Sequence, residues 1–311
     1  ILLSMSKIFK IFGVLIAVLA VVYGVMMKLI LPSYLTTVIP AVENLTTNYI
    51  NGKVNIGQIS LAPDLTLQAG DISVVNTKGD EIATVPVLKI GINPLQGLTS
   101  QSALGAVSSI TINNPVLKLS MDKKDKWNFT GLIKPSEEKS TAFKGKIYVN
   151  NGNLLVNTPY GNWEAGLTGK IDAADDPEYS FNSDLLINNE TVNAAGVINT
   201  DMEGKINVKT SSLRLDSFAQ LLAHYLPVKE IGGSVADVDL SWENNGTVAM
   251  SGSGKFAGTR GRVVSAGYDV PVVLNGKIYF KGMDVQADNL QALVNQQECR
   301  IKGGLDVSDT S

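Results

Sequence analysis

Few residues in this chain have the types and spacing that catalysis or metal binding requires. His224 is the only histidine and Cys299 the only cysteine, so neither a Ser-His-Asp set nor a zinc site can be built around them. Gly252-Ser253-Gly254 lacks the wider Gly-x-Ser-x-Gly pattern of hydrolases. A phosphate-binding Gly-x-x-x-x-Gly-Lys-Ser/Thr loop is also missing from the sequence. We therefore predict no enzymatic activity, no cofactor and no metal.

Paired carboxylates, which could act as a general acid and base, occur where turns and strands are expected. The Asp175-Asp176 pair suits a turn. Asp237 and Asp239 alternate with Val238 and Leu240, which is the spacing of the two faces of a strand. The formal net charge is −3 and no basic face is visible. These features argue against a nucleic-acid partner.

The longest apolar stretch runs from Lys7 to Pro32 and carries no charge between Ile11 and Met27. With Leu29 to Leu31 it reaches roughly 20 residues, the length with which a helix crosses a hydrocarbon core of about 30 Å. We predict an uncleaved transmembrane anchor, because the run continues well past the possible signal-peptide cleavage site at Ala20. The predicted anchor residues are Ile11, Phe12, Leu15, Val18, Leu19, Val22 and Val25.

The charges beside this segment predict its orientation. Lys7 and Lys10 precede it, so the positive-inside rule places the N-terminus in the cytoplasm and exports the rest of the chain from Ser33. A single cysteine excludes an intramolecular disulfide framework. These features fit a bacterial envelope protein with one membrane span and an exported bulk.

After the predicted anchor, the hydrophobic pattern changes from helical to alternating. Residues 33–50 predict a short amphipathic helix, which either caps a core or lies on the membrane surface. From Gly52 onward, apolar and polar residues alternate with period two, which predicts half-buried antiparallel strands. The Asn113-Asn114-Pro115 segment is expected to turn the chain. Apolar positions of these strands include Leu65, Leu67, Ile90, Ile92, Leu117, Leu119, Ile147 and Val149.

A repeated tripeptide marks the second half of the chain. Gly-Lys-Ile occurs at residues 145–147, 169–171, 204–206 and 276–278. Asn151-Gly152, Asn188-Asn189, Asn245-Gly246 and Asn275-Gly276 are expected hairpin turns between alternating runs. Together they predict a continuous antiparallel meander.

The domain boundaries follow from these patterns. We expect the cytoplasmic tip and anchor at 1–32, a helix and first β-section at 33–131, and a polar linker at 132–142. The repeating β-section at 143–311 is expected to continue beyond residue 311 in the native protein, because the strand-like run from Ile301 has no cap.

One segment interrupts the meander. Leu215 to Leu226 has apolar residues at helical spacing and is followed by Pro227, which predicts a short helix with Asp216 as its N-cap. We expect this helix to lie across one end or the mouth of the sheet.

The order of these elements resembles the AsmA-like family of bacterial envelope proteins, which includes AsmA and TamB. The resemblance rests on the anchor, the short helix and the run from Val107 through Asn113-Asn114-Pro115 to Leu119, followed by Trp127-Asn128-Phe129. It covers essentially the whole chain and includes no catalytic motif. It implies a mainly β, elongated, curved antiparallel β-groove with an apolar interior, together with one or two short helices. It also implies a single-pass anchor in the bacterial inner membrane, with the bulk of the chain in the periplasm.

The resemblance also implies functions. One is phospholipid transport between the inner and outer membranes, with acyl chains lying on the eight strand positions named above. The alternative is a scaffold for outer-membrane protein assembly with an outer-membrane barrel partner, as proposed for the TamB branch. A closed β-sandwich whose apolar faces pack on each other remains the structural alternative to an open groove.

Overall fold

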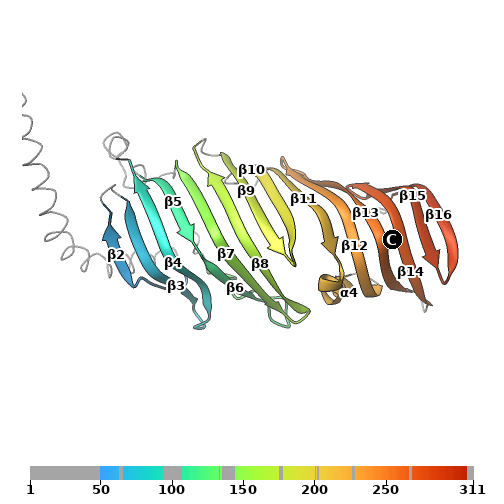
Figure 1. Ribbon diagram of the computed structural model, residues 1–311, viewed down its shortest axis with the longest axis horizontal. Coiled ribbons are helices and arrows are strands. Elements are labelled where there is room, and N and C mark those ends of the chain that lie inside the picture. The colour runs from blue at the N-terminus through green and yellow to red at the C-terminus, as the bar shows by residue number, and fades with distance from the viewer. Residues whose placement is uncertain are drawn as a thin grey trace, which may run out of the picture.

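In the computed structural model the chain forms one long curved β-sheet with a short helix at its edge (Figure 1). The structure describes residues 50–62, 66–93, 107–132, 134, 144–174, 178–199, 201, 203–225, 228–265 and 268–306. The prediction of a mainly β protein is confirmed. The predicted membrane anchor and the helix at 33–50 lie outside the described residues, as does Leu65. No helix in the described ranges is both long and apolar enough to span a membrane.

The sheet has 16 strands. The first part contains β1 (Gly52–Asn55), β2 (Gln58–Leu61), β3 (Leu67–Asn76), β4 (Glu81–Ile92), β5 (Val107–Asn113) and β6 (Val116–Ser120). The second part begins with β7 (Lys146–Thr158), β8 (Gly161–Asp172), β9 (Glu178–Ile187), β10 (Glu190–Asn199) and β11 (Gly204–Arg214). It continues through η3 (Asp216–Phe218) and α4 (Ala219–Tyr225) to β12 (Val228–Asn244), β13 (Val248–Ser265), β14 (Tyr268–Lys281), β15 (Asp284–Val294) and β16 (Gln297–Asp306).

The sheet is mixed, so the expectation of a wholly antiparallel meander is wrong at one place. Both β5 and β6 pair with β7 in parallel, while the other strand pairs are antiparallel. The chain from Met121 to Gly145 separates β6 from β7, and a parallel pair needs a connection of about a dozen residues or more. Alternation predicts a strand and its faces but contains no information on its direction. The predicted 132–142 linker falls in this connection, and the strands on either side of it belong to one sheet.

Three segments predicted as turns do not reverse the chain. At Asn114-Pro115 the chain keeps its direction, and the ladder to β7 continues through Asn114 N to Asn150 O (2.8 Å) and Asn153 N to Pro115 O (2.7 Å). Asn151-Gly152 and Asn275-Gly276 lie at register shifts inside β7 and β14. The positive φ that favours Asn-Gly in a hairpin turn is equally required in many β-bulges, so the local signal is the same. The Asn188-Asn189 and Asn245-Gly246 turns do connect strands, as predicted.

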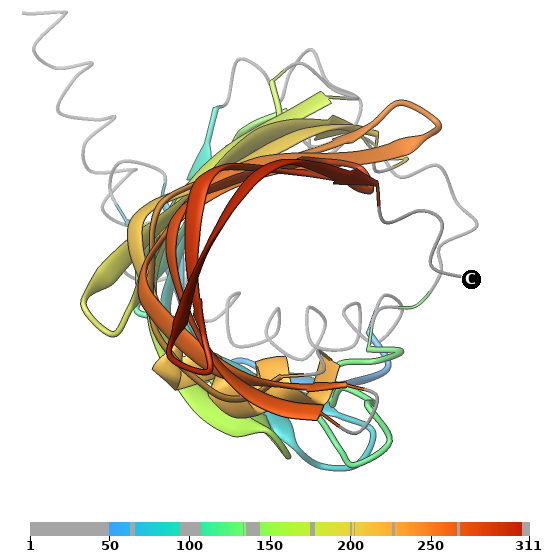
Figure 2. The same cartoon turned by 90° about the vertical axis from the view of Figure 1, so that its right-hand side faces the viewer.

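A line of bulges crosses the C-terminal half of the sheet. Gly233, Gly258, Gly276 and Asn289 have positive φ on the consecutive strands β12 to β15. They are neighbours, since the Asn275 side chain accepts a hydrogen bond from Gly258 N at 2.7 Å, and a Cβ on Gly276 would lie 2.8 Å from Asn289 O. Bulges bend a strand and increase its twist. Their alignment bends β12 to β15 in the same direction, and the sheet forms an open arc when viewed along its length (Figure 2).

The short helix lies at the lower edge of the sheet beside β12 (Figure 1). Phe218 stacks on Trp163 of β8 at 5.8 Å between ring centroids, and Trp163 Nε1 donates to Ser217 O at 2.6 Å. His224 stacks on Tyr160, in the β7–β8 turn, at 4.0 Å. The helix therefore bridges this hairpin and β12. Asp216 is not its N-cap as predicted, because its carboxylate accepts Gly233 N instead.

Candidate functional site: the apolar face of the sheet

Cross-strand pairing gathers apolar side chains into continuous rows on one face of the sheet. Directly paired residues point to the same face. One row runs from β3 to β13 through successive pairs: Leu67, Ile90, Ile110, Ile147, Ile171, Phe181, Gly196, Ile206, Trp242 and Met250. We name this face, together with the row described next, the apolar face.

The second row is displaced from the first by two residues along each strand, and it crosses more strands. It extends from β2 to β15 through Ile59, Ala69, Leu88, Ile112, Val149, Gly169, Ser183, Ala194, Val208, Leu240, Gly252, Phe280 and Val285. Ser183 is its one polar member, and the hydroxyl donates to Ala194 O at 3.3 Å. No charged side chain therefore interrupts this row between β2 and β15.

The apolar face is shielded only in part. Within the described residues, no large side chain is completely buried. Ile59, Leu88 and Val208 are half-buried, and Met250 is 50% exposed. The described strands all belong to one sheet, so a second sheet of a sandwich is not found among them.

Burial indicates that the apolar face is the concave side of the arc. Side chains converge on the inside of a curved single layer and shield one another, whereas they spread apart on the outside. Leu290 and Ala292, which line up with the apolar face on β15, are 8% and 2% exposed. Leu293, which points the other way on the same strand, is 42% exposed.

The opposite, convex face is polar and carries ion pairs. Lys118 Nζ lies 2.6 Å from Glu81 Oε1, and Lys209 Nζ lies 3.0 Å from Asp239 Oδ2. Such exposed pairs contribute little to stability. They show that charged side chains are concentrated on the convex face of these strands.

The best-connected ion pair of this face joins β13 and β14. Arg262 Nε donates to Asp269 Oδ1 at 2.9 Å. This hydrogen bond lowers the pKa of the Asp269 carboxyl below its usual value, although partial burial opposes the shift. It also raises the pKa of the Arg262 guanidinium.

The structure brings six of the eight predicted strand positions to the apolar face. Leu67, Ile90, Ile147 and Val149 belong to the two rows. Leu117 and Leu119 pair with Leu154 and Val156 of β7 and continue the face beyond the bulges. Ile92 pairs with Val107 at the end of β4. Whether any of them contacts a lipid stays a prediction.

Sequence reasoning missed most apolar-face residues from β8 onward, including Phe181, Val208 and Leu240. The Gly-Lys-Ile repeat was the available signal. In the copies at residues 145–147, 169–171 and 204–206, the isoleucine lies on the apolar face and the lysine on the polar face. Ile147, Ile171 and Ile206 therefore belong to the same row. The repeat therefore marks register as well as strand position.

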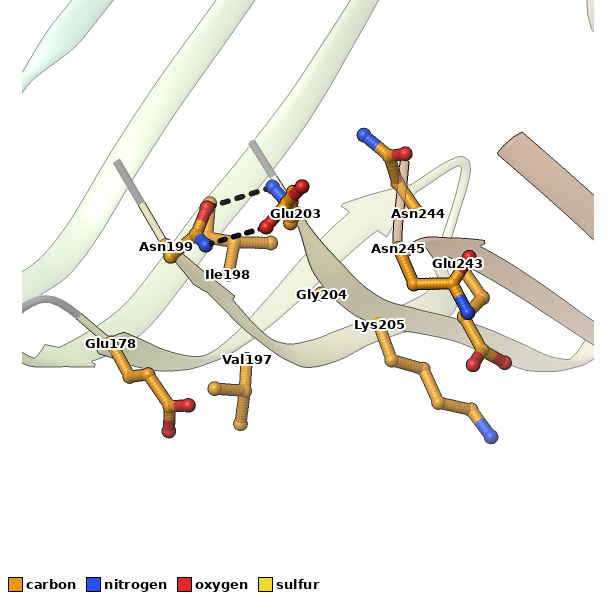
Figure 3. Close-up of a pocket in the computed structure, with 10 residues that line it drawn as sticks. All are labelled: Glu178, Val197, Ile198, Asn199, Glu203, Gly204, Lys205, Glu243, Asn244 and Asn245. Carbon is orange, nitrogen blue, oxygen red and sulfur yellow. Dashed lines mark hydrogen bonds between the residues drawn. The ribbon is translucent and has the colours of Figure 1, made fainter. Parts of the chain in front are cut away.

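Two hollows lie along the sheet. The first, about 310 Å³, lies between the helix and the apolar face of β12 to β14, and its lining includes Leu222, Val235 and Phe256. The second, about 430 Å³, lies at the upper ends of β9 to β12 (Figure 3). There Glu203 is held by Asn199, whose side-chain amide donates to Oε2 at 3.2 Å and whose Oδ1 accepts Glu203 N at 2.8 Å. This pattern closes the turn between β10 and β11.

Metal-binding chemistry is likewise not found in the described ranges, where no group of three or more His, Cys, Asp or Glu residues could hold an ion. Comparison with known proteins adds no assignment: no family model matches the chain, and no curated protein or solved structure is significantly similar to it. The candidate site is therefore the apolar face itself.

Proposed function

We propose that this protein is a bacterial inner-membrane protein that carries phospholipid acyl chains across the periplasm along its apolar face, as an open β-groove. The observation that carries the proposal is the row from Ile59 to Val285, which stays apolar or small across successive strands and is covered by no second sheet among the described residues. The resemblance to the AsmA-like family supports the same function.

The energetic problem of lipid transport explains why such a row is useful. A 16-carbon chain exposed to water costs roughly 13 kcal/mol at about 0.8 kcal/mol per CH₂. A concave aliphatic surface shields the chain without fixed polar contacts, while the headgroup stays in water at the open side. This role needs a continuous lining, and no particular side chain is indispensable.

The dimensions of the row suit several lipids in series. At about 4.8 Å per strand, a row from β2 to β15 extends for roughly 60 Å. One acyl chain spans about half of a 30 Å hydrocarbon core, or roughly 15 Å, and thus covers about three strands. A lipid could therefore move from one group of strands to the next without leaving the apolar surface.

The proposed location follows from the sequence. The apolar segment at 7–32 would anchor the chain in the inner membrane, with the β-sheet in the periplasm and its far end towards the outer membrane.

Photocrosslinking in living cells tests this function. A photoreactive amino acid at Ile147 or Leu119, on the apolar face, is expected to give lipid adducts detectable by mass spectrometry. The matched control is Tyr148, which pairs with Lys170 on the opposite face and is expected to give none. Absence of lipid adducts at both apolar positions, in a protein that folds and accumulates normally, would rule the proposal out.

A second candidate is a scaffold for outer-membrane protein assembly. It is favoured by the resemblance to the TamB branch of the AsmA-like family, for which such a role is proposed. This function predicts crosslinks from β16 to a β-strand of another protein. It also predicts that polar substitutions on the apolar face are harmless.

A further inference from the structure

The hollow between the helix and the sheet differs from the open rows of the apolar face because it is bounded on two sides. Leu215 and Leu222 close it from the helical segment, and Val235, Phe256 and Leu274 line it from β12 to β14. Because a cavity of about 150 Å³ holds one benzene molecule, a volume of about 310 Å³ takes roughly a dozen carbon atoms. The hollow therefore has room for most of one acyl chain and not for two.

The lining of the hollow offers no partner to a polar headgroup. Thr259 is 6% exposed, and its hydroxyl already donates to Ser234 O at 2.6 Å. Arg260, the one charged residue of the described lining, pairs with Val273, whose partner Leu293 lies on the convex face. Its guanidinium therefore points to the other side of the sheet. The hollow can hold hydrocarbon, while a headgroup has to stay outside it.

An open apolar row lies directly beside the hollow. In this adjacent row, Ile278 pairs with Gly254 on one side and with Ala287 on the other. Gly254 is two residues from Phe256, a separation of about 6.6–6.8 Å along the strand. A Cβ on Gly254 would lie only 2.8 Å from Val235 Cγ1, so the row and the hollow meet at this glycine. The two form neighbouring apolar tracks on the same face.

We propose that this corner of the apolar face binds a single diacyl phospholipid, with one acyl chain in the hollow under the helix and the other on the adjacent row. The inference rests on the proposed function and adds a resting site for one transported molecule. The two acyl chains are joined at their glycerol ends, so they need two apolar tracks side by side and an open side for the headgroup. A fatty acid has one chain, and its carboxylate would lie unpaired beside apolar side chains, which is unfavourable.

A phosphatidylethanolamine with a photoreactive diazirine in each acyl chain tests this arrangement on the full chain in lipid nanodiscs. Because one molecule occupies both tracks, irradiation is expected to join the peptide that contains Leu222 to the peptide that contains Ala287 through a single lipid. Mass spectrometry detects this lipid-bridged pair of peptides. A probe with a diazirine in only one chain should label either peptide and bridge none.

Matched variants assign each acyl chain to its track. Leu222→Trp fills the hollow and should abolish the bridged product, while single adducts at Ala287 persist. Gln220→Trp, at an exposed position of α4, should leave the product unchanged. Ile278→Asp places a charge on the adjacent row and should abolish the bridge but keep single adducts at Leu222. Its control is Tyr279→Asp on the opposite face of β14, and thermal melting verifies that each variant is folded.

The outcomes separate this proposal from the proposed function. Single adducts on both peptides without a bridged product would refute the two-chain site, because separate lipids would then occupy the two tracks. Labelling of the hollow by diazirine-bearing palmitate and not by the phospholipid would also refute it. Adducts near Ile147 without any near Leu222 would refute the site but leave the transport function standing. Absence of adducts at both places would contradict both.

Discussion

Gly276 shows how single residues shape this sheet. Its φ of 133° is rare for residues with a side chain, and a Cβ would approach both Asn289 O and Leu290 Cα to 2.8 Å. Because the backbones of β14 and β15 come this close, the bulge requires glycine. Gly258 on β13 and Asn289 on β15 also have a positive φ. The aligned bulges of these neighbouring strands therefore contribute to one bend of the sheet.

At the residue scale we predict that Gly276→Ala destabilises the fold by about 1–3 kcal/mol, through positive-φ strain and the clash with β15. The control is Gly304→Ala, where the nearest atom would lie at 3.5 Å and φ is not in the positive region. Urea titration of both variants measures the difference. Equal urea midpoints for the two variants would show that the bulge in β14 tolerates a side chain and does not depend on glycine.

At the scale of elements, the helix is held by a few specific contacts. Trp163 both stacks on Phe218 and donates to Ser217 O, and Asn188 Nδ2 donates to Ser217 Oγ at 2.7 Å. These contacts attach the helix to the β7–β10 region, while its other side packs on β12. The helix thus closes the lower edge of the sheet and bounds the hollow beneath it.

We predict that Trp163→Phe loosens this attachment by about 0.5–1.5 kcal/mol, because it keeps the ring stack and removes the hydrogen bond. Hydrogen exchange should accelerate in residues 216–225 and remain unchanged in β14 and β15. Trp127→Phe, in the loop after β6, is the matched control and should leave the helix protected. Unchanged exchange at 216–225 in Trp163→Phe would mean that stacking alone holds the helix.

At the scale of the whole molecule, the proposed function depends on an apolar row that continues without interruption from strand to strand. The row from Ile59 to Val285 links strands far apart in sequence through direct pairs, and half-buried neighbours on the same face stabilise each pair by about 0.2–1 kcal/mol. A single sheet gains stability without a second layer in this way, and its inner surface stays accessible.

We predict that Val208→Asp, in the middle of this row, interrupts lipid movement. Lipid crosslinks from Ile147 should persist, and those from Phe280, on the far side of the charge, should fall at least tenfold, because a charge among apolar side chains opposes hydrocarbon contact. Asn207→Asp on the polar face, where Asn207 pairs with Ser241, is the matched control. Undiminished crosslinks from Phe280 would indicate that lipids enter at many points along the sheet, so that continuity is not required.

The sequence by itself determined that the chain is mainly β-strand and which side chains share a face within an uninterrupted alternating run. Period-two alternation at Leu117 and Leu119, or at Ile147 and Val149, is a local property, and it predicted their shared face without knowledge of the partner strand. The helix near Phe218 was predictable for the same reason, because its spacing and the following proline are local signals.

Only the tertiary structure decided what these strands do together. The parallel pairing of β5 and β6 with β7, the use of Asn275-Gly276 as a bulge instead of a turn, and the lack of a second sheet over the described apolar face all depend on contacts between distant residues. Alternation is the same whether a face is sealed by another layer or left open, because the pattern reports that one side avoids water and contains nothing about what covers it.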